Sequence, residues 1–148
     1  MPEKETLQRA KQDLREGKAP STAAGEFVHE EIEHVREGKH GARSPQQAIA
    51  IGLSKARRAG IPLKPPKSGS PEVRRKAERE YEEGQEHRGR KPSAARSKSR
   101  EKALKREPKS TVSPRALSKQ TKRASAKRSS ASKSAAAKRG ARTRAASR

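Results

Sequence analysis

Apolar side chains recur at helical spacing in three successive segments of the first 60 residues. The first segment runs from about residue 3 to residue 16, and its Leu7, Ala10 and Leu14 form a narrow apolar strip. Gly17 follows it directly, and a glycine in this position favours the left-handed conformation that ends many helices. The pattern therefore predicts an amphipathic helix that stops at Gly17.

The second segment has a wider apolar face. It starts at Ser21 or Thr22, either of which is a good helix N-cap, and it stops at Gly38. With about 100° between successive residues, its apolar side chains fall within an arc of about 140°, the width of a core-facing stripe. These residues are Ala24, Phe27, Val28, Ile32 and Val35. The opposite, acidic face comprises Glu26, Glu30, Glu33 and Glu37.

The third segment opens with Ser44-Pro45-Gln46-Gln47, which supplies an N-cap, a proline in the first turn and a glutamine at the capping-box position. We expect this helix to end near Gly60. Small residues repeat every four positions on its apolar side and would let another helix approach closely. That side comprises Ala48, Ile49, Gly52, Leu53, Ala56 and Ala59. The other side displays three cations that could face a phosphate backbone: Lys55, Arg57 and Arg58.

The sequence becomes more polar after this unit. Residues 62–71 are rich in Pro, Gly and Lys, which is typical of a hinge. Residues 72–90 allow a short charged helix with Val73, Ala77 and Tyr81 at four-residue spacing.

Residues 91–148 are a low-complexity mixture of Ala, Ser, Lys and Arg, with only three large aliphatic residues, Leu104, Val112 and Leu117. Low hydrophobicity combined with high net charge leaves too little apolar surface to offset chain entropy, so we expect this tail to be disordered. The predicted fold class is therefore all-α: a small three-helix domain over residues 1–61, followed by the hinge, the charged segment and a long disordered basic tail.

A helical unit of this size buries little surface and is expected to be marginally stable. Pairing of two copies through its apolar helix faces would compensate, so a homodimer is one expected partnership. The residues available for this contact are Phe27, Val28 and Ile32.

The charge of the chain is concentrated in the tail. The 148 residues contain 39 Lys and Arg against 17 Asp and Glu, a net charge of +22, and residues 91–148 alone account for +18. Such an excess requires a polyanionic partner, for which DNA is the first candidate and RNA or the ribosome the alternative. Specific RNA readers stack bases on aromatic side chains, and only Phe27 and Tyr81 are present, which favours DNA.

The tail cations are spaced every two to four residues, a spacing that suits contacts with successive phosphates. Ser113-Pro114-Arg115 also resembles the short turns by which histone tails enter the minor groove. Outside the third helix, the predicted contact residues are Arg88, Arg90, Lys91, Lys105, Arg106, Arg115, Lys122, Arg123, Lys127, Arg128, Lys138, Arg139, Arg142 and Arg144.

Enzymatic chemistry is not indicated. His29 and His34 resemble a zinc-protease pair, but they are five residues apart instead of four, so a helix turns their imidazoles away from each other by about 140°. His40 and His87 lie in polar, Gly-rich sequence, and the chain contains no cysteine. We therefore predict a protein that is not an enzyme and has no metal and no cofactor.

The lack of long apolar segments bears on the cellular location of the protein and on membrane binding. No apolar run approaches the roughly 20 residues of a membrane span, and the first residues resemble neither a secretory signal nor a transit peptide. The tail also lacks a face of large apolar residues that would insert among lipids. We expect a cytoplasmic, nucleoid-associated protein that does not bind membranes.

Three stretches of the sequence resemble a known family. They are Ser21-Thr22-Ala23-Ala24-Gly25-Glu26-Phe27-Val28, then Arg36-Glu37-Gly38-Lys39-His40-Gly41-Ala42-Arg43-Ser44, then Gln47-Ala48-Ile49-Ala50-Ile51-Gly52-Leu53-Ser54-Lys55-Ala56-Arg57-Arg58-Ala59-Gly60. Residues 3–66 are similar to a family of small, basic, functionally uncharacterised bacterial proteins commonly labelled DNA-binding. The tail separately resembles the Ala-, Lys- and Ser-rich tails of bacterial linker-histone-like proteins. The family resemblance implies DNA binding. The charge of the tail predicts that this binding is largely sequence-independent and electrostatic, through phosphate contacts.

Overall fold

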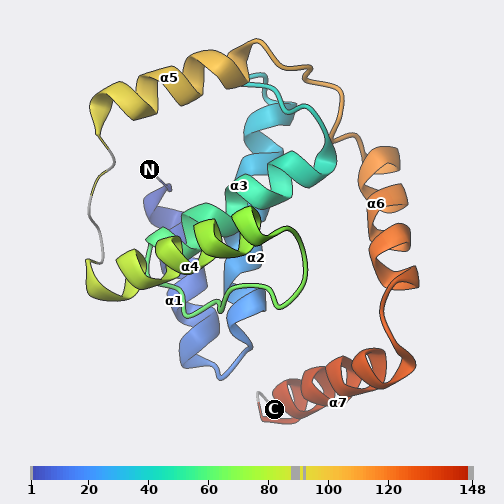
Figure 1. Cartoon of the computed structure of the whole chain (residues 1–148). Coiled ribbons are helices and arrows are strands. Elements are labelled where there is room, and N and C mark those ends of the chain that lie inside the picture. The colour runs from blue at the N-terminus through green and yellow to red at the C-terminus, as the bar shows by residue number, and fades with distance from the viewer. Residues whose placement is uncertain (1, 88–90, 92, 147–148) are drawn as a thin grey trace.

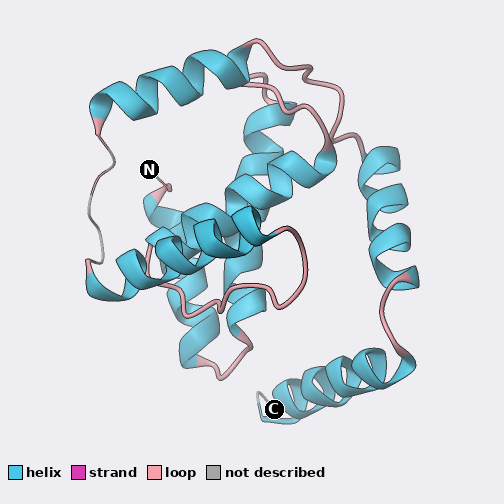
Figure 2. Ribbon diagram, viewed as in Figure 1, coloured by secondary structure: helices cyan, strands magenta, loops and turns pink. Residues whose placement is uncertain are grey.

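The computed structural model describes residues 2–87, 91 and 93–146. Within these residues the chain forms seven α-helices and no strand (Figures 1 and 2). The helices are α1 (Lys4–Arg15), α2 (Pro20–Arg36), α3 (Pro45–Arg58), α4 (Pro71–Glu86), α5 (Ala94–Lys105), α6 (Pro114–Ala126) and α7 (Ser130–Ala146).

The helices α1, α2 and α3 lie where the apolar pattern predicts them. Gly17, Gly38 and Gly60 each follow a helix with φ between 77° and 93°, the left-handed conformation that glycine adopts without strain. Ser44 caps α3, because its Oγ accepts a hydrogen bond from the backbone N–H of Gln47 at 3.2 Å. The start of α2 differs from the expectation: Ala19 is its N-cap and Pro20 stands in its first turn.

The small residues of α3 allow α2 to pack unusually close. A Cβ atom at Gly52 would lie 2.6 Å from the Cα of Val28, a distance that real side chains do not tolerate. Ala48 and Ala56, one turn before and after Gly52, are fully buried. The predicted close approach of a helix to this side of α3 is therefore present, and the neighbour is α2.

The main core lies between α1, α2 and α3. It contains Ala10, Ala23, Ala24, Phe27, Ala56 and Ile61, with the partly buried Leu7, Leu14, Leu53, Ala59 and Leu63 packed around them. Phe27 is fully buried, and Val28 faces Gly52. Phe27 is thus used within the chain, whereas Val28 and Ile32 are partly exposed, and pairing with a second copy stays a prediction.

The helix α4 packs against α3 at Gly84, where a Cβ atom would collide with the carbonyl of Arg57. A buried carboxylate braces the two helices. Glu80 accepts hydrogen bonds from Ser54 Oγ at 2.8 Å and from an Arg58 NH2 nitrogen at 3.1 Å. The charged segment after the hinge is thus part of the packed unit, which consists of four helices.

The predicted disordered tail is wrong. Beyond residue 93, most of the described chain is helical and forms α5, α6 and α7. Two local reasons account for this: Ala, Lys and Arg have high helix propensity, and Ser93 and Ser113 accept N-cap hydrogen bonds that start α5 and α6. The three helices form an arc around the four-helix unit (Figure 1).

The arc is anchored by the segment between α5 and α6. The backbone N–H groups of Gly41 and Ala42 donate to the carbonyls of Leu104 at 2.8 Å and Pro108 at 2.9 Å. Thr111 Oγ1 donates back to the carbonyl of Ala42 at 2.7 Å. This segment therefore adds hydrogen bonds to the loop between α2 and α3, beside which it lies in Figure 1.

A second apolar cluster fixes the same contact. Val112 is fully buried together with Val35, Ala42 and Ala48, and Leu117 of α6 packs against them. Two of the three large aliphatic residues of the tail, Val112 and Leu117, thus pack in this cluster, which explains why a low average hydrophobicity did not leave the segment unstructured.

We expect Val112→Ala to lower the free energy of unfolding by about 2 kcal/mol, because it removes two buried methyl groups and leaves a cavity. Amide hydrogen exchange of residues 106–117 should become faster in the same variant. Val73→Ala is the matched control, since the Val73 side chain is 56% exposed. Equal losses of stability in the two variants would show that burial of Val112 does not hold the segment between α5 and α6 in place.

Candidate nucleic-acid interface

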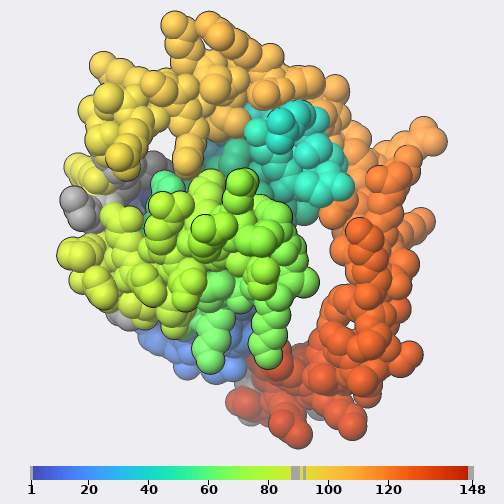
Figure 3. Space-filling view, in the orientation of Figure 1, coloured from blue at the N-terminus to red at the C-terminus, as the bar shows by residue number. Residues whose placement is uncertain are grey.

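The helices α5, α6 and α7 form the most basic surface of the molecule. None of their residues is buried. The cations of α6 are exposed, and a gap separates much of this helix from the four-helix unit in the space-filling view (Figure 3). We refer to these three helices and the segments joining them, residues 94–146, as the basic arc.

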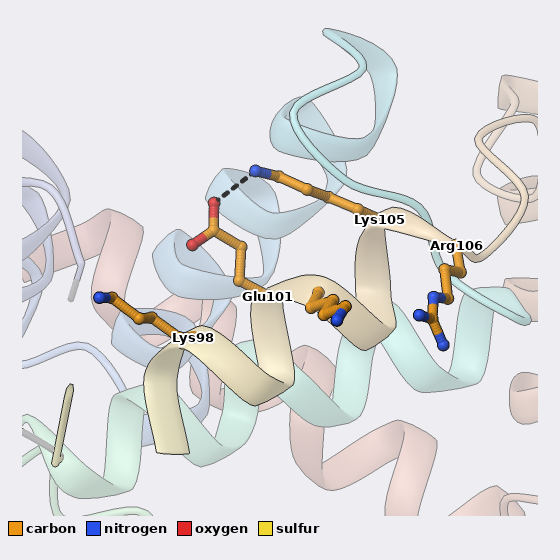
Figure 4. A pocket seen from close by; sticks show the side chains of 5 residues that line it. Lys98, Glu101, Lys105 and Arg106 are labelled. Carbon is orange, nitrogen blue, oxygen red and sulfur yellow. Dashed lines mark ion pairs between the residues drawn. The ribbon is translucent and has the colours of Figure 1, made fainter. Parts of the chain in front are cut away.

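A shallow pocket of about 350 Å³ lies along α5. It is lined by Lys98, Glu101, Lys102, Lys105 and Arg106 (Figure 4). Glu101 binds Lys105 at 2.9 Å, and this hydrogen bond lowers the pKa of the Glu101 carboxyl below its ordinary value. Four cations around one carboxylate leave the pocket with excess positive charge, which suits a phosphate group.

The helices α6 and α7 contain nine Lys and Arg residues and no Asp or Glu. Three pairs of cations stand four residues apart on one helix face: Arg115 with Lys119, Lys119 with Arg123, and Lys138 with Arg142. Side chains at this spacing are neighbours, and like charges there destabilise a helix by a few tenths of a kcal/mol. An anion bound between such cations would relieve the repulsion.

The predicted tail contacts that the structure describes are exposed. They are Lys91, Lys105, Arg106, Arg115, Lys122, Arg123, Lys127, Arg128, Lys138, Arg139, Arg142 and Arg144. Arg128 additionally donates to the carbonyl oxygen of Ser132 at 3.2 Å. Arg88 and Arg90 lie outside the described residues.

Sequence reasoning missed the cations of α5, namely Arg96, Lys98, Arg100 and Lys102. Their spacing of four residues was visible in the sequence, but it has meaning only if the segment is helical. Ser113-Pro114-Arg115 resembles the short turns of histone tails in sequence. In the structure it is the start of α6, with Ser113 as the N-cap and Pro114 in the first turn.

The three cations predicted on α3 bind partners within the chain. Lys55 forms an ion pair with the fully buried Glu31 and lies 3.8 Å from Glu30. Arg57 is buried, donates to the carbonyl of Leu63 at 3.2 Å, and has a pKa lowered by burial. Arg58 binds Glu80, as described above. Their contact with a nucleic acid stays a prediction.

Other cations of the four-helix unit are paired as well. Arg9 of α1 binds Glu26 of α2 at 2.6 Å. Lys18 binds Asp13 at 2.7 Å and Glu16 at 2.9 Å, and these contacts raise its pKa. Residues 91–148 carry +18 of the net charge of +22, so the excess of positive charge is concentrated in and around the basic arc.

Among the described residues, no helix is long and apolar enough to span a membrane. Comparison of the chain with protein-family models, with curated proteins and with solved structures finds no match. The family resemblance of residues 3–66 stays a prediction, and the function is argued from the residues of the site.

We expect Lys55→Gln to lower the free energy of unfolding by about 2 to 3 kcal/mol, because it leaves buried carboxylates without their cation. Urea denaturation followed by circular dichroism measures the change. Lys98→Gln on α5 removes the same charge from an exposed position and should change stability by less than about 0.5 kcal/mol. A neutral effect of Lys55→Gln would show that this ion pair does not stabilise the fold.

Proposed function

We propose that the protein binds duplex DNA with little sequence preference, through the cations of the basic arc. One observation supports this most directly: nine exposed or partly exposed cations of α6 and α7 lie on helices without a single carboxylate. Each phosphate neutralised by such a cation releases condensed counterions, which provides affinity independent of base sequence.

The arrangement also suggests different roles for the four-helix unit and the basic arc in DNA binding. The four-helix unit pairs Lys55 and Arg58 of α3 with its own buried carboxylates and acts as a scaffold, while the anchor at Val112 holds α5 and α6 at its surface. The basic arc then presents its cations on several helices, so one molecule could contact phosphates on more than one side. Such binding would compact or bridge DNA and fits a nucleoid-associated role in the cytoplasm.

Recognition of single-stranded RNA has less support. Base stacking requires accessible aromatic side chains, and the chain has one Phe, one Tyr and no Trp. Phe27 is fully buried, and Tyr81 is partly buried. Binding to structured RNA through phosphates alone remains an outcome of the experiment below.

The test compares two variants of equal charge. One replaces four cations of the basic arc, Lys122→Gln, Arg123→Gln, Lys138→Gln and Arg139→Gln. The other replaces four exposed cations of the four-helix unit, Lys4→Gln, Lys11→Gln, Arg15→Gln and Arg74→Gln. Both lower the net charge from +22 to +18, so only the position of the lost charge differs.

We expect the arc variant to bind duplex DNA more weakly, and the slope of log K against log salt to become shallower by up to about 4 units. The control variant should change the slope by less than about 1 unit. Equal losses in the two variants would indicate attraction by overall charge without a defined interface. Stronger competition by structured RNA than by duplex DNA would favour the RNA alternative.

A further inference from the structure

A group of histidine and carboxylate side chains converges beside the anchor of the basic arc. Glu31 and His34 of α2 and His40 of the loop between α2 and α3 each offer one ligand atom, and these atoms all lie within 4.8 Å of one another. Glu31 is fully buried, and the two imidazoles are 15% and 12% exposed. The sequence pattern did not reveal this group, because the turn at Gly38 brings His40 back toward α2.

The Glu31 carboxylate is only half satisfied. One oxygen, Oε1, accepts a hydrogen bond from Lys55. The other, Oε2, is buried, and no described residue donates a hydrogen bond to it. A buried carboxylate oxygen without a donor is costly, so this atom points to a cation that would complete its surroundings.

The hydrogen bond from His40 to the carbonyl of Gly41 determines which ring nitrogen of His40 has a lone pair available for a metal ion. Its Nδ1 lies 2.9 Å from the carbonyl oxygen of Gly41. A carbonyl only accepts, so Nδ1 must bear the proton, and neutral His40 then has its lone pair on Nε2. That Nε2 lies 3.2 Å from Glu31 Oε2, outside hydrogen-bonding geometry. Two electron-rich atoms at this distance that do not bond each other are arranged like neighbouring ligands of one metal ion.

His34 is oriented in the same way. Its outer nitrogen, Nε2, lies 3.2 Å from Glu3 Oε1, and this hydrogen bond lowers the pKa of the Glu3 carboxyl. The inner nitrogen, Nδ1, then bears no proton and lies 3.8 Å from Glu31 Oε1, the oxygen that also accepts from Lys55. Histidine ligands of metals usually donate their second ring nitrogen to a carboxylate or a carbonyl, and here both histidines do so.

We propose that Glu31, His34 and His40 bind a transition-metal ion of the Zn²⁺ type. Ligand atoms of a tetrahedral zinc site stand about 3.3 Å apart. His40 Nε2 and Glu31 Oε2 are already 3.2 Å apart, whereas the other ligand atoms, all within 4.8 Å of one another, would move together by up to about 1.5 Å. The charge is also suitable, since the carboxylates of Glu30 and Glu31 face one lysine. Two imidazole nitrogens and one carboxylate favour zinc over magnesium, which prefers oxygen ligands.

A second grouping of Glu3, Glu30 and His34 is less suitable. Glu30 Oε1 already accepts hydrogen bonds from the backbone N–H of Glu3 at 2.6 Å and from Thr6 Oγ1 at 3.2 Å. Glu30 Oε2 is buried without a hydrogen-bond donor, as Glu31 Oε2 is, and lies 3.8 Å from Lys55 Nζ, but Glu3 is 55% exposed and this grouping contains only one histidine. Glu3 therefore orients His34 instead of holding the metal. Three protein ligands leave a fourth position for water, and the ion would tie the end of α2 to the loop on which the basic arc is anchored.

The experiment titrates the full-length, chelator-treated protein with Zn²⁺ in competition with a chromophoric chelator, without DNA. We expect one Zn²⁺ per chain and no binding of Mg²⁺. His34→Ala and His40→Ala should each weaken Zn²⁺ binding at least about 100-fold, and Glu3→Gln about 10-fold. Co²⁺ in place of Zn²⁺ should give the intense visible absorption of a tetrahedral site.

His29→Ala and His87→Ala are matched controls, because both histidines are exposed and outside the group. Their Zn²⁺ affinity should equal that of the unchanged protein. The proposal is overturned if the protein binds no Zn²⁺, or if the control variants lose as much affinity as His34→Ala and His40→Ala. If His40→Ala does not fold, the Glu3→Gln affinity and the Co²⁺ spectrum still decide the question. Because DNA is absent, either result is independent of the proposed DNA binding.

Discussion

The close contact between α2 and α3 is the constraint on which the rest of the structure depends. Gly52 lets the two backbones approach, and this brings Lys55 of α3 to the buried Glu31 of α2. A larger residue at Gly52 would separate the helices and leave the carboxylates of α2 without their cation. The same pairing fixes the loop between α2 and α3, to which the segment from Leu104 to Val112 is bound. Packing, charge neutralisation and anchoring of the basic arc are therefore coupled through one helix pair.

The four-helix unit and the helices α6 and α7 differ in how their positive charges are balanced. In the four-helix unit, cations are balanced by nearby carboxylates, such as Glu26 for Arg9 and Glu80 for Arg58. In α6 and α7 no carboxylate is present, so stability depends on helix propensity, N-caps and contact with the second apolar cluster. Repulsion among these cations decreases when salt or a polyanion is present. The least balanced region is thus the one that gains most from a partner.

The sequence predicts the first three helices because period, N-caps and glycines agree there. It also predicts the tight packing side of α3 from small residues at a four-residue repeat. It misleads in the tail, because an average over many polar residues hides three aliphatic ones, of which Val112 and Leu117 join the second apolar cluster. The outward side assigned to Lys55, Arg57 and Arg58 was a property of an isolated helix, whereas α3 contacts α2, α4 and α6. Likewise, helical periodicity does not predict that His40 lies near His34, because the chain turns at Gly38 between the two residues.

The anchor at Val112 lies between two basic segments, α5 before it and α6 with α7 after it. We call these segments the two arms of the basic arc. The arm before it, α5, ends at the anchor, where the carbonyl of Leu104 accepts a hydrogen bond from the backbone of Gly41. Among the described residues, the arm after it, α6 and α7, contacts the other helices through α6, by Leu117 and the contact with α3. When one arm has engaged a polyanion, the other remains within a short distance of it, so its binding becomes an intramolecular event with a high effective concentration. Detaching the anchor would therefore weaken avidity without removing a single positive charge.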